Sequence, residues 1–165
     1  QQQNRPAPLD LILSMPLEAA SLRCEKVWEE PLAFVAAPSS ELASRAKLSL
    51  PDLAGRTLLV AKHDCAYRME LQQEMTEARI EPRAVIELNS LESVARCASE
   101  GMGIALLPEA SVSAEMRAET LVKLRFRKPR RACLYFFRHN DKPLKGAFGA
   151  FVAAVDAHFK ALRKH

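Results

Sequence analysis

The sequence predicts an α/β fold with a largely parallel sheet in its middle portion. Short apolar runs alternate with segments whose apolar residues recur at helical spacing, and glycine or proline stands at several of the junctions. The composition agrees, because 48% of the 165 residues are hydrophobic and 27% are charged, as in a compact soluble domain. Disordered, collagen-like and membrane-spanning proteins are excluded, and we expect one or two small domains.

The first third of the chain is predicted to contain extended segments. Residues 9–13, 22–27 and 32–37 are apolar runs separated by polar or proline-containing stretches. The Pro38-Ser39-Ser40 sequence then ends this pattern, and residues 48–55 are typical of a turn.

Two units of strand followed by helix come next. Residues 57–61 predict a buried strand and residues 65–79 a helix, which Pro82 stops. Residues 84–88 predict a second strand. Asn89, with Glu92 three residues later, predicts the N-cap and capping box of a helix that Gly101 ends.

The remainder continues the alternation. Residues 104–107 predict a strand, Pro108 is expected to open a helix to about Met116, and residues 121–126 and 133–137 predict two further strands. A long C-terminal helix is predicted from an apolar stripe consisting of Leu144, Phe148, Phe151, Val152, Val155, Phe159 and Leu162. If its packing partner were missing, we expect either self-association through this stripe, with exchange of the helix between chains as one form, or a separate polypeptide that supplies the missing part.

The charge is mildly basic. Lysine and arginine number 24 against 20 acidic residues, which gives a net charge of +4. Much of the excess lies in one segment interrupted by Pro129, consisting of Lys123, Arg125, Arg127, Lys128, Arg130 and Arg131. We interpret it as a strand end running into a solvated turn, with phosphate binding as the alternative.

The cysteines indicate neither a zinc site nor a disulfide framework. Cys24, Cys65, Cys97 and Cys133 include no CxxC pair, and no histidine stands at metal-ligand spacing. We therefore expect reduced thiols, no metal and no cofactor. Because the N-terminus also lacks a hydrophobic export signal, we expect a cytoplasmic protein that does not contact a membrane.

The loops that follow the predicted parallel strands are the candidate binding site. In an open parallel sheet, ligands bind beyond the carboxyl ends of the strands, where helix N-termini present backbone N–H groups. This rule selects a first loop containing His63, Asp64, Cys65 and Tyr67, a second at Asn89 and Ser90, and a third at Leu107 and Pro108. Helix capping by Asp64 and by Asn89 is the alternative explanation at the first two loops.

Catalysis is not expected. His63 and Cys65 suggest a catalytic thiolate–imidazole pair. However, residues two apart in sequence rarely face each other, and no oxyanion motif accompanies them. Paired carboxylates, a nucleophile motif and a metal set are all missing, so we expect no enzyme.

The order of motifs resembles the effector-binding domain of LysR-type transcriptional regulators from residue 9 to residue 162. The resemblance rests on LASRAKLSLPDLAGRTLLV, the helix containing Arg68, IELNSLESVARCASEGMGIALLPE, ETLVKLRF and LYFFRHND. It is most specific at residues 89–108. Ser40-Glu41-Leu42-Ala43 departs from the family's usual His-Pro-Leu-Ala.

The resemblance implies a fold similar to type II periplasmic binding proteins, in which two Rossmann-like subdomains are joined by two crossover strands and an inducer binds between them. Residues 1–37 and 127–165 would form an incomplete first subdomain, and residues 38–126 the second. The implied ligand contacts are Ser14 and the three loops already selected. A polar or anionic small-molecule effector and a homo-oligomer are implied, and DNA would be bound only by an N-terminal domain that this chain lacks.

Two other classes of protein remain open at this point. A solute-binding protein of a transport system shares the architecture, and so do some enzymes. The missing export signal and apparently unpaired cysteines count against the first alternative.

Overall fold

The computed structural model describes residues 10–13, 22–62, 66–139 and 146–162, and the chain forms two compact units. Unit 1 comprises Gln1–Glu29 and Cys133–His165, and unit 2 comprises Glu30–Ala132. The sequence predicted that the second subdomain spans residues 38–126. Unit 2 begins earlier, at Glu30, and ends later, at Ala132. Strands β2 (Leu22–Ala36) and β7 (Arg130–His139) contribute residues to both units.

Unit 2 contains the parallel sheet that the alternation predicts. Strand β3 (Thr57–Ala61) pairs in parallel with β4 (Ala84–Leu88) on one side and with β5 (Ile104–Pro108) on the other. The order is β2-β5-β3-β4, with β2 antiparallel to β5 and the short β6 (Val122–Lys123) antiparallel to β2. The prediction that the three central strands share one sheet is confirmed.

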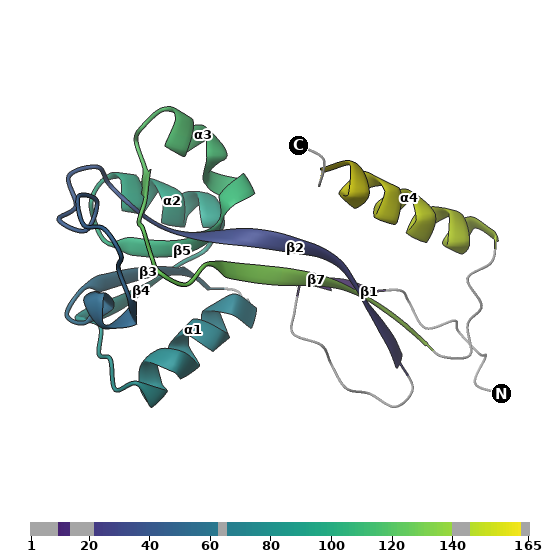
Figure 1. Ribbon diagram of the computed structural model, residues 1–165, viewed down its shortest axis with the longest axis horizontal. Helices are drawn as coiled ribbons and strands as arrows, with labels where there is room; N and C mark the ends of the chain where they lie inside the picture. The colour runs from purple at the N-terminus through teal and green to yellow at the C-terminus, as the bar shows by residue number, and fades with distance from the viewer. Residues whose placement is uncertain (1–9, 14–21, 63–65, 140–145, 163–165) are drawn as a thin grey trace. The chain divides into compact units, whose positions relative to one another are not determined.

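Helices cover both faces of this sheet (Figure 1). Helix α1 (Ala66–Glu77) packs Tyr67, Leu71 and Met75 on one face, and α2 (Leu91–Ser99) packs Val94, Ala95 and Ala98 on the other. Alternate residues of a strand point to opposite faces. Phe34 and Leu106 therefore lie on the α1 side, whereas Val35 and Leu107 lie on the α2 side.

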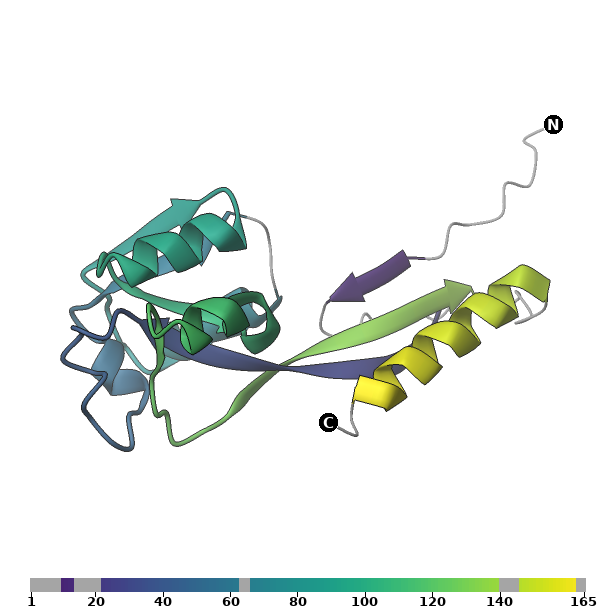
Figure 2. The same cartoon turned by 90° about the horizontal axis from the view of Figure 1, so that it is seen from above.

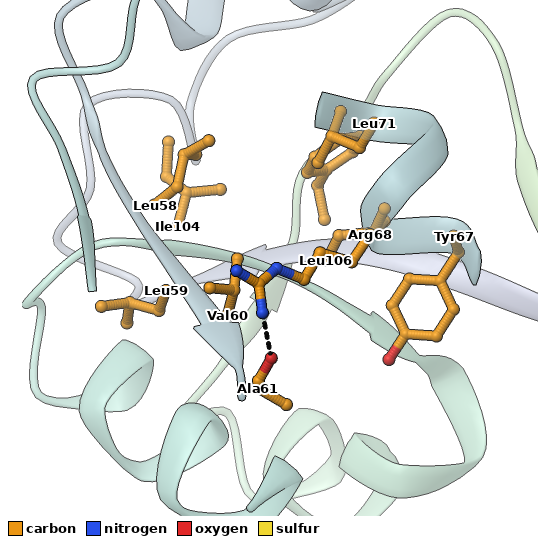
Figure 3. A pocket seen from close by; sticks show the side chains of 10 residues that line it. Leu58, Leu59, Val60, Ala61, Tyr67, Arg68, Leu71, Ile104 and Leu106 are labelled. Carbon is orange, nitrogen blue, oxygen red and sulfur yellow. Dashed lines mark hydrogen bonds between the residues drawn. The ribbon is translucent and has the colours of Figure 1, made fainter. Parts of the chain in front are cut away.

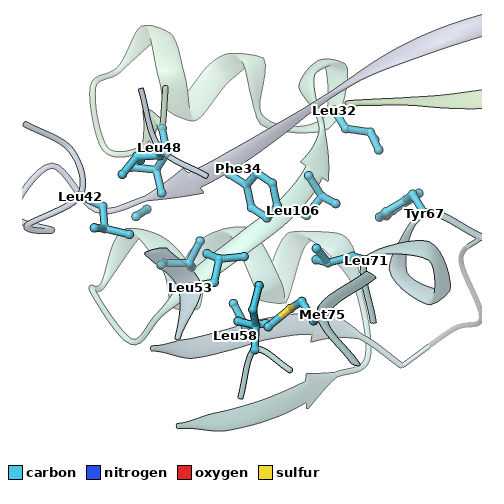
Figure 4. Close-up of a cluster of buried hydrophobic side chains, with 14 of the residues drawn as sticks. Leu32, Phe34, Leu42, Leu48, Leu53, Leu58, Tyr67, Leu71, Met75 and Leu106 are labelled. Carbon is cyan, nitrogen blue, oxygen red and sulfur yellow. The ribbon is translucent and has the colours of Figure 1, made fainter. Parts of the chain in front are cut away.

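The larger core lies between α1 and the sheet. Phe34 lies among leucines contributed by distant segments, including Leu48, Leu53 and Leu106 (Figure 4). Its ring stacks on Phe126, with 4.1 Å between centroids. Leu53 belongs to a 3-10 turn, η1 (Leu50–Leu53), in the segment where a turn was predicted.

Glycine is required at two positions around β5. Gly101 follows α2 with φ of +79°, as predicted for a residue that ends a helix. A Cβ on Gly103 would lie 2.6 Å from the Thr57 carbonyl oxygen and 3.1 Å from Leu59 Cγ, so β5 approaches β3 closely because residue 103 has no side chain.

Two local predictions were wrong. The N-cap of α2 is Ser90 instead of Asn89, because Ser90 is extended and its Oγ accepts a hydrogen bond from Ser93 N–H at 3.1 Å. Pro108 ends β5, where it pairs with Leu32, and does not open a helix. It is followed by a 3-10 turn, η2 (Glu109–Val112), and by the five-residue α3 (Ser113–Arg117).

Strand lengths also differ from the predicted ones. Residues 22–36 form one strand and not two, because Pro31 is exposed and ladder pairing with β5 begins only at Leu32. Only Val122 and Lys123 of the predicted strand 121–126 are paired residues of β6, since the following Phe126 N–H turns back to the Leu124 carbonyl.

Unit 1 contains β1 (Asp10–Leu13), most of β7 and α4 (Gly146–Leu162). Strand β1 pairs antiparallel with β7 (Figure 2), and in that register Leu11 stands opposite Phe136. Within the apolar stripe of α4, Phe159 is half-buried and stacks on Trp28 at 5.1 Å, whereas Phe151 is 50% exposed. Leu144 lies outside the described residues.

Candidate functional site

The carboxyl ends of three strands meet at one edge of the unit 2 sheet. Ala61 ends β3, Leu88 ends β4 directly beside it, and Pro108 ends β5. The Lys62 N–H donates to the Leu88 carbonyl at 2.7 Å, so the chain leaving β3 stays attached to β4. This is the edge at which parallel sheets bind ligands.

Helix α2 starts at this edge. Ser90 Oγ accepts from the Ser93 N–H and lies 3.0 Å from Ser93 Oγ. The other N–H groups of a helix's first turn have no partner inside the helix, and they carry the positive end of its dipole. Because Asn89 is exposed and Ser90 half-buried, a polar ligand can reach this end of the helix.

The other predicted site residues differ in accessibility. Tyr67 is buried in the core beneath α1, and Leu107 is 1% exposed on the α2 side. Pro108 is half-buried at the strand end. Leu107 can therefore offer a ligand only its backbone. Four predicted site residues lie outside the described residues, namely Ser14, His63, Asp64 and Cys65.

Arg68 joins the same edge from α1, and the prediction of site residues did not include it. Its Nη1 donates to the Ala61 carbonyl at 2.8 Å (Figure 3), and its Nη2 contacts Glu87 Oε1 on β4. The guanidinium thus connects the first turn of α1 to the last residue of β3. It borders a small cavity of about 20 Å³, enough for one water molecule, with Tyr67 and Leu71 among its other walls.

Other chemistry gains no support from the described residues. Within them, no three histidine, cysteine or acidic side chains are placed to hold a metal ion. Cys97 and Cys133 are free thiols. In the ranges that the structure describes, no helix combines the length and the apolar character needed to cross a membrane.

Comparison with known proteins identifies the family. The family model of the LysR substrate binding domain matches residues 9–160. The chain belongs to the LysR substrate-binding domain family. GltR of Bacillus subtilis, an HTH-type transcriptional regulator, is 29% identical over 157 residues, which are 92% of this chain and 50% of GltR. This LysR domain spans about half the length of the curated relatives it matches.

Solved structures of regulatory and effector-binding domains share the fold of this chain. The regulatory domain of Synechocystis PCC6803 CcmR superimposes with a TM-score of 0.80 at 22% identity, over 92% of this chain and 73% of that one. The effector-binding domain of QuiR gives a TM-score of 0.73 at 16% identity, over 90% of this chain and 70% of the QuiR chain. The predicted α/β fold of the type II periplasmic-binding-protein class is confirmed. The relatives are named as transcriptional regulators, so the solute-binding alternative is not favoured.

Proposed function

We propose that this LysR domain senses a small polar or anionic effector at the carboxyl edge of β3, β4 and β5. The single observation that carries the proposal is the N-terminus of α2, which opens beside the ends of two parallel strands and is bordered by exposed Asn89. Backbone N–H groups and the helix dipole there favour a carboxylate or phosphate.

The ligands of two structural relatives support a ligand of this kind. The CcmR regulatory domain was solved in complex with 2-PG, and the QuiR domain with shikimate, which is a hydroxylated carboxylate. For this chain we infer the class of ligand only. Asn89 and Ser90 would contact it with side chains, and Leu107 and Pro108 through the strand end.

The remaining predicted contacts are part of the same proposal. Ser14, His63, Asp64, Cys65 and Tyr67 would supply the further ligand contacts that the sequence predicts. The role is binding without catalysis, metal or cofactor. We further propose that the protein forms homo-oligomers and that a separate N-terminal segment binds DNA.

Ligand-induced stabilisation of the 165-residue chain tests this function. Carboxylates and phosphorylated acids would be screened by thermal unfolding, because a ligand at 100 times its dissociation constant stabilises the folded state by about 2.7 kcal/mol. We expect at least one polar anion to raise the midpoint while its uncharged amide or alcohol analogue does not. Stabilisation by apolar neutral compounds alone would contradict the proposal.

Two substitutions at Ser90 separate capping from ligand binding. Ser90→Asp keeps an N-cap and should preserve stability within about 0.5 kcal/mol, but its carboxylate should repel an anion and abolish the ligand shift. Ser90→Gly removes the side chain at a loss of only a few tenths of a kcal/mol and leaves the helix N–H groups in place, so it should still bind, with a smaller ligand shift because one side-chain contact is lost. Equal ligand shifts in wild type and Ser90→Asp would remove the start of α2 from the site.

A further inference from the structure

A second polar hollow lies in unit 2 and shares no residue with the predicted effector site. We call it the basic groove; it has a volume of about 620 Å³ and is lined by residues 31–34, 109, 123–126 and 128–131. Its floor contains the buried Leu32, Ala33, Phe34 and Leu124. The volume is in the range of small-molecule sites.

The charged side chains that line the groove are almost all cationic. They are Lys123, Arg125, Lys128, Arg130 and Arg131, against the single carboxylate Glu109. Two of these cations form ion pairs with carboxylates: Lys123 contacts Glu109, and Arg130 contacts Glu74 of α1. Among the described residues, no carboxylate forms an ion pair with Arg125 or Lys128, and both are exposed.

Packing and hydrogen bonds hold the walls of the groove in position. Arg130 donates to both oxygens of Glu74, at 3.1 and 2.5 Å, and its guanidinium lies 5.8 Å from the centroid of Phe34. The buried Leu48 holds the segment around Arg125 and Arg127 in place. Its N–H donates to the Arg125 carbonyl at 2.8 Å, and its carbonyl accepts from Arg127 N–H at 2.9 Å. The cations of this segment therefore stand on an anchored backbone.

We propose that the basic groove binds a small anion with two or more negative charges, in addition to the effector at the strand ends. Arg125 and Lys128, which form no ion pair with a carboxylate among the described residues, supply the attraction, and Arg130, held by Glu74, lines the groove beside them. A hollow with an apolar floor suits a compact ligand better than an extended polyanion, which needs a long surface track. The same geometry accepts a phosphorylated or a polycarboxylate molecule.

Amide NMR of the 165-residue chain tests the proposal, since the spectrum shows where an anion binds. Sodium pyrophosphate and sodium citrate would be titrated separately at constant ionic strength, with sodium chloride as the monovalent control. We expect saturable shifts at residues 31–34 and 123–131 with one or both multivalent anions and none with chloride. Binding by pyrophosphate alone indicates phosphorylated ligands, and binding by citrate alone indicates carboxylates.

A matched pair of double variants separates a site from diffuse charge. Arg125→Gln with Lys128→Gln should weaken anion binding by about tenfold or more, because two charges facing the ligand are removed. Arg83→Gln with Arg96→Gln removes two exposed charges outside the groove and should leave the affinity within about twofold.

Each of the following results would overturn the proposal. One is the absence of saturable shifts around the groove with either anion. Another is equal weakening in the two double variants, which would show a diffuse electrostatic effect. The third is binding of hexaglutamate or single-stranded DNA at these residues when pyrophosphate and citrate do not bind, which would assign the groove to a macromolecule. Shifts confined to residues 89–93 would report the effector site alone and also reject the groove.

Discussion

Replacing Arg68 with methionine should destabilise unit 2 more than its position on a partly exposed helix suggests. The substitution keeps an aliphatic stem of similar reach but removes the guanidinium that joins α1 to β3 and β4. The Ala61 carbonyl loses the charged donor 2.8 Å away, in a residue that is 9% exposed. The consequence is a buried acceptor with one hydrogen bond fewer.

The expected magnitude follows from the two contacts. A hydrogen bond from a charged donor contributes about 1.5–3 kcal/mol. The contact with Glu87 adds little, about 0–1 kcal/mol, because the Glu87 side chain is 48% exposed and an exposed ion pair is screened by water. We therefore expect Arg68→Met to lower the free energy of unfolding by about 2 kcal/mol.

Urea unfolding followed by far-ultraviolet circular dichroism measures this change. Circular dichroism is preferable to tryptophan fluorescence because the single tryptophan, Trp28, lies in unit 1 and Arg68 lies in unit 2. Arg83→Met is the matched control at an exposed arginine and should change stability by less than about 0.5 kcal/mol. Glu87→Gln removes the ion pair with Arg68 and leaves the hydrogen bond from Arg68 to the Ala61 carbonyl in place.

Two results would refute this reasoning. If Arg68→Met matched the Arg83→Met control, the hydrogen bond to Ala61 would contribute nothing measurable. If Glu87→Gln were as destabilising as Arg68→Met, the ion pair and not the carbonyl contact would be the stabilising interaction.

Three further substitutions test the fold. Gly103→Ala should destabilise by about 1–3 kcal/mol, because its Cβ would meet the Thr57 carbonyl oxygen at 2.6 Å. Leu59→Ala should lower the free energy of unfolding by about 2–5 kcal/mol, because Leu59 is 1% exposed in the core. The hydrogen bond from the Ser49 N–H lowers the pKa of Asp52, so Asp52→Asn should be destabilising at neutral pH, and the difference from wild type should shrink as pH falls below about 4.

The sign of the pH effect follows from proton binding. An aspartate whose pKa is lower in the folded state stabilises the fold above its unfolded pKa and loses that contribution as pH falls through the folded value. Chemical unfolding at a series of pH values measures it. A difference between wild type and Asp52→Asn that grew on acidification would contradict the assignment. For Gly103→Ala and Leu59→Ala, an unfolding midpoint equal to that of the wild type would contradict the predicted loss of stability.

The central strands were predictable because local signals agree there with tertiary packing. Residues 57–61 and 84–88 are short apolar runs bounded by polar residues, and they became β3 and β4 with the predicted bounds. The turn at Gly101 followed from the same local chemistry, since glycine readily adopts a positive φ.

The failures occurred where long-range pairing decides the outcome. Asn89 and Ser90 are both good N-caps, and which one caps α2 depends on where β4 ends. Pro31 predicts a break locally, but it is tolerated because ladder pairing with β5 begins at Leu32.

The same holds for two features whose contacts the sequence did not predict. Arg68 meets the Ala61 carbonyl seven residues earlier, a contact for which no side-chain pattern exists. The basic segment 123–131 forms a groove only because β2 supplies its floor from residues 31–34.

A crystal structure of the chain with the strongest anion from the thermal screen tests the central claim most directly. The claim predicts a ligand oxygen within hydrogen-bonding distance of the backbone N–H groups at the start of α2, beside Asn89 and Ser90 and next to the end of β4. Density for the bound anion elsewhere, with no ligand atom near the first turn of α2, would contradict the account of this domain as an effector sensor at the strand ends.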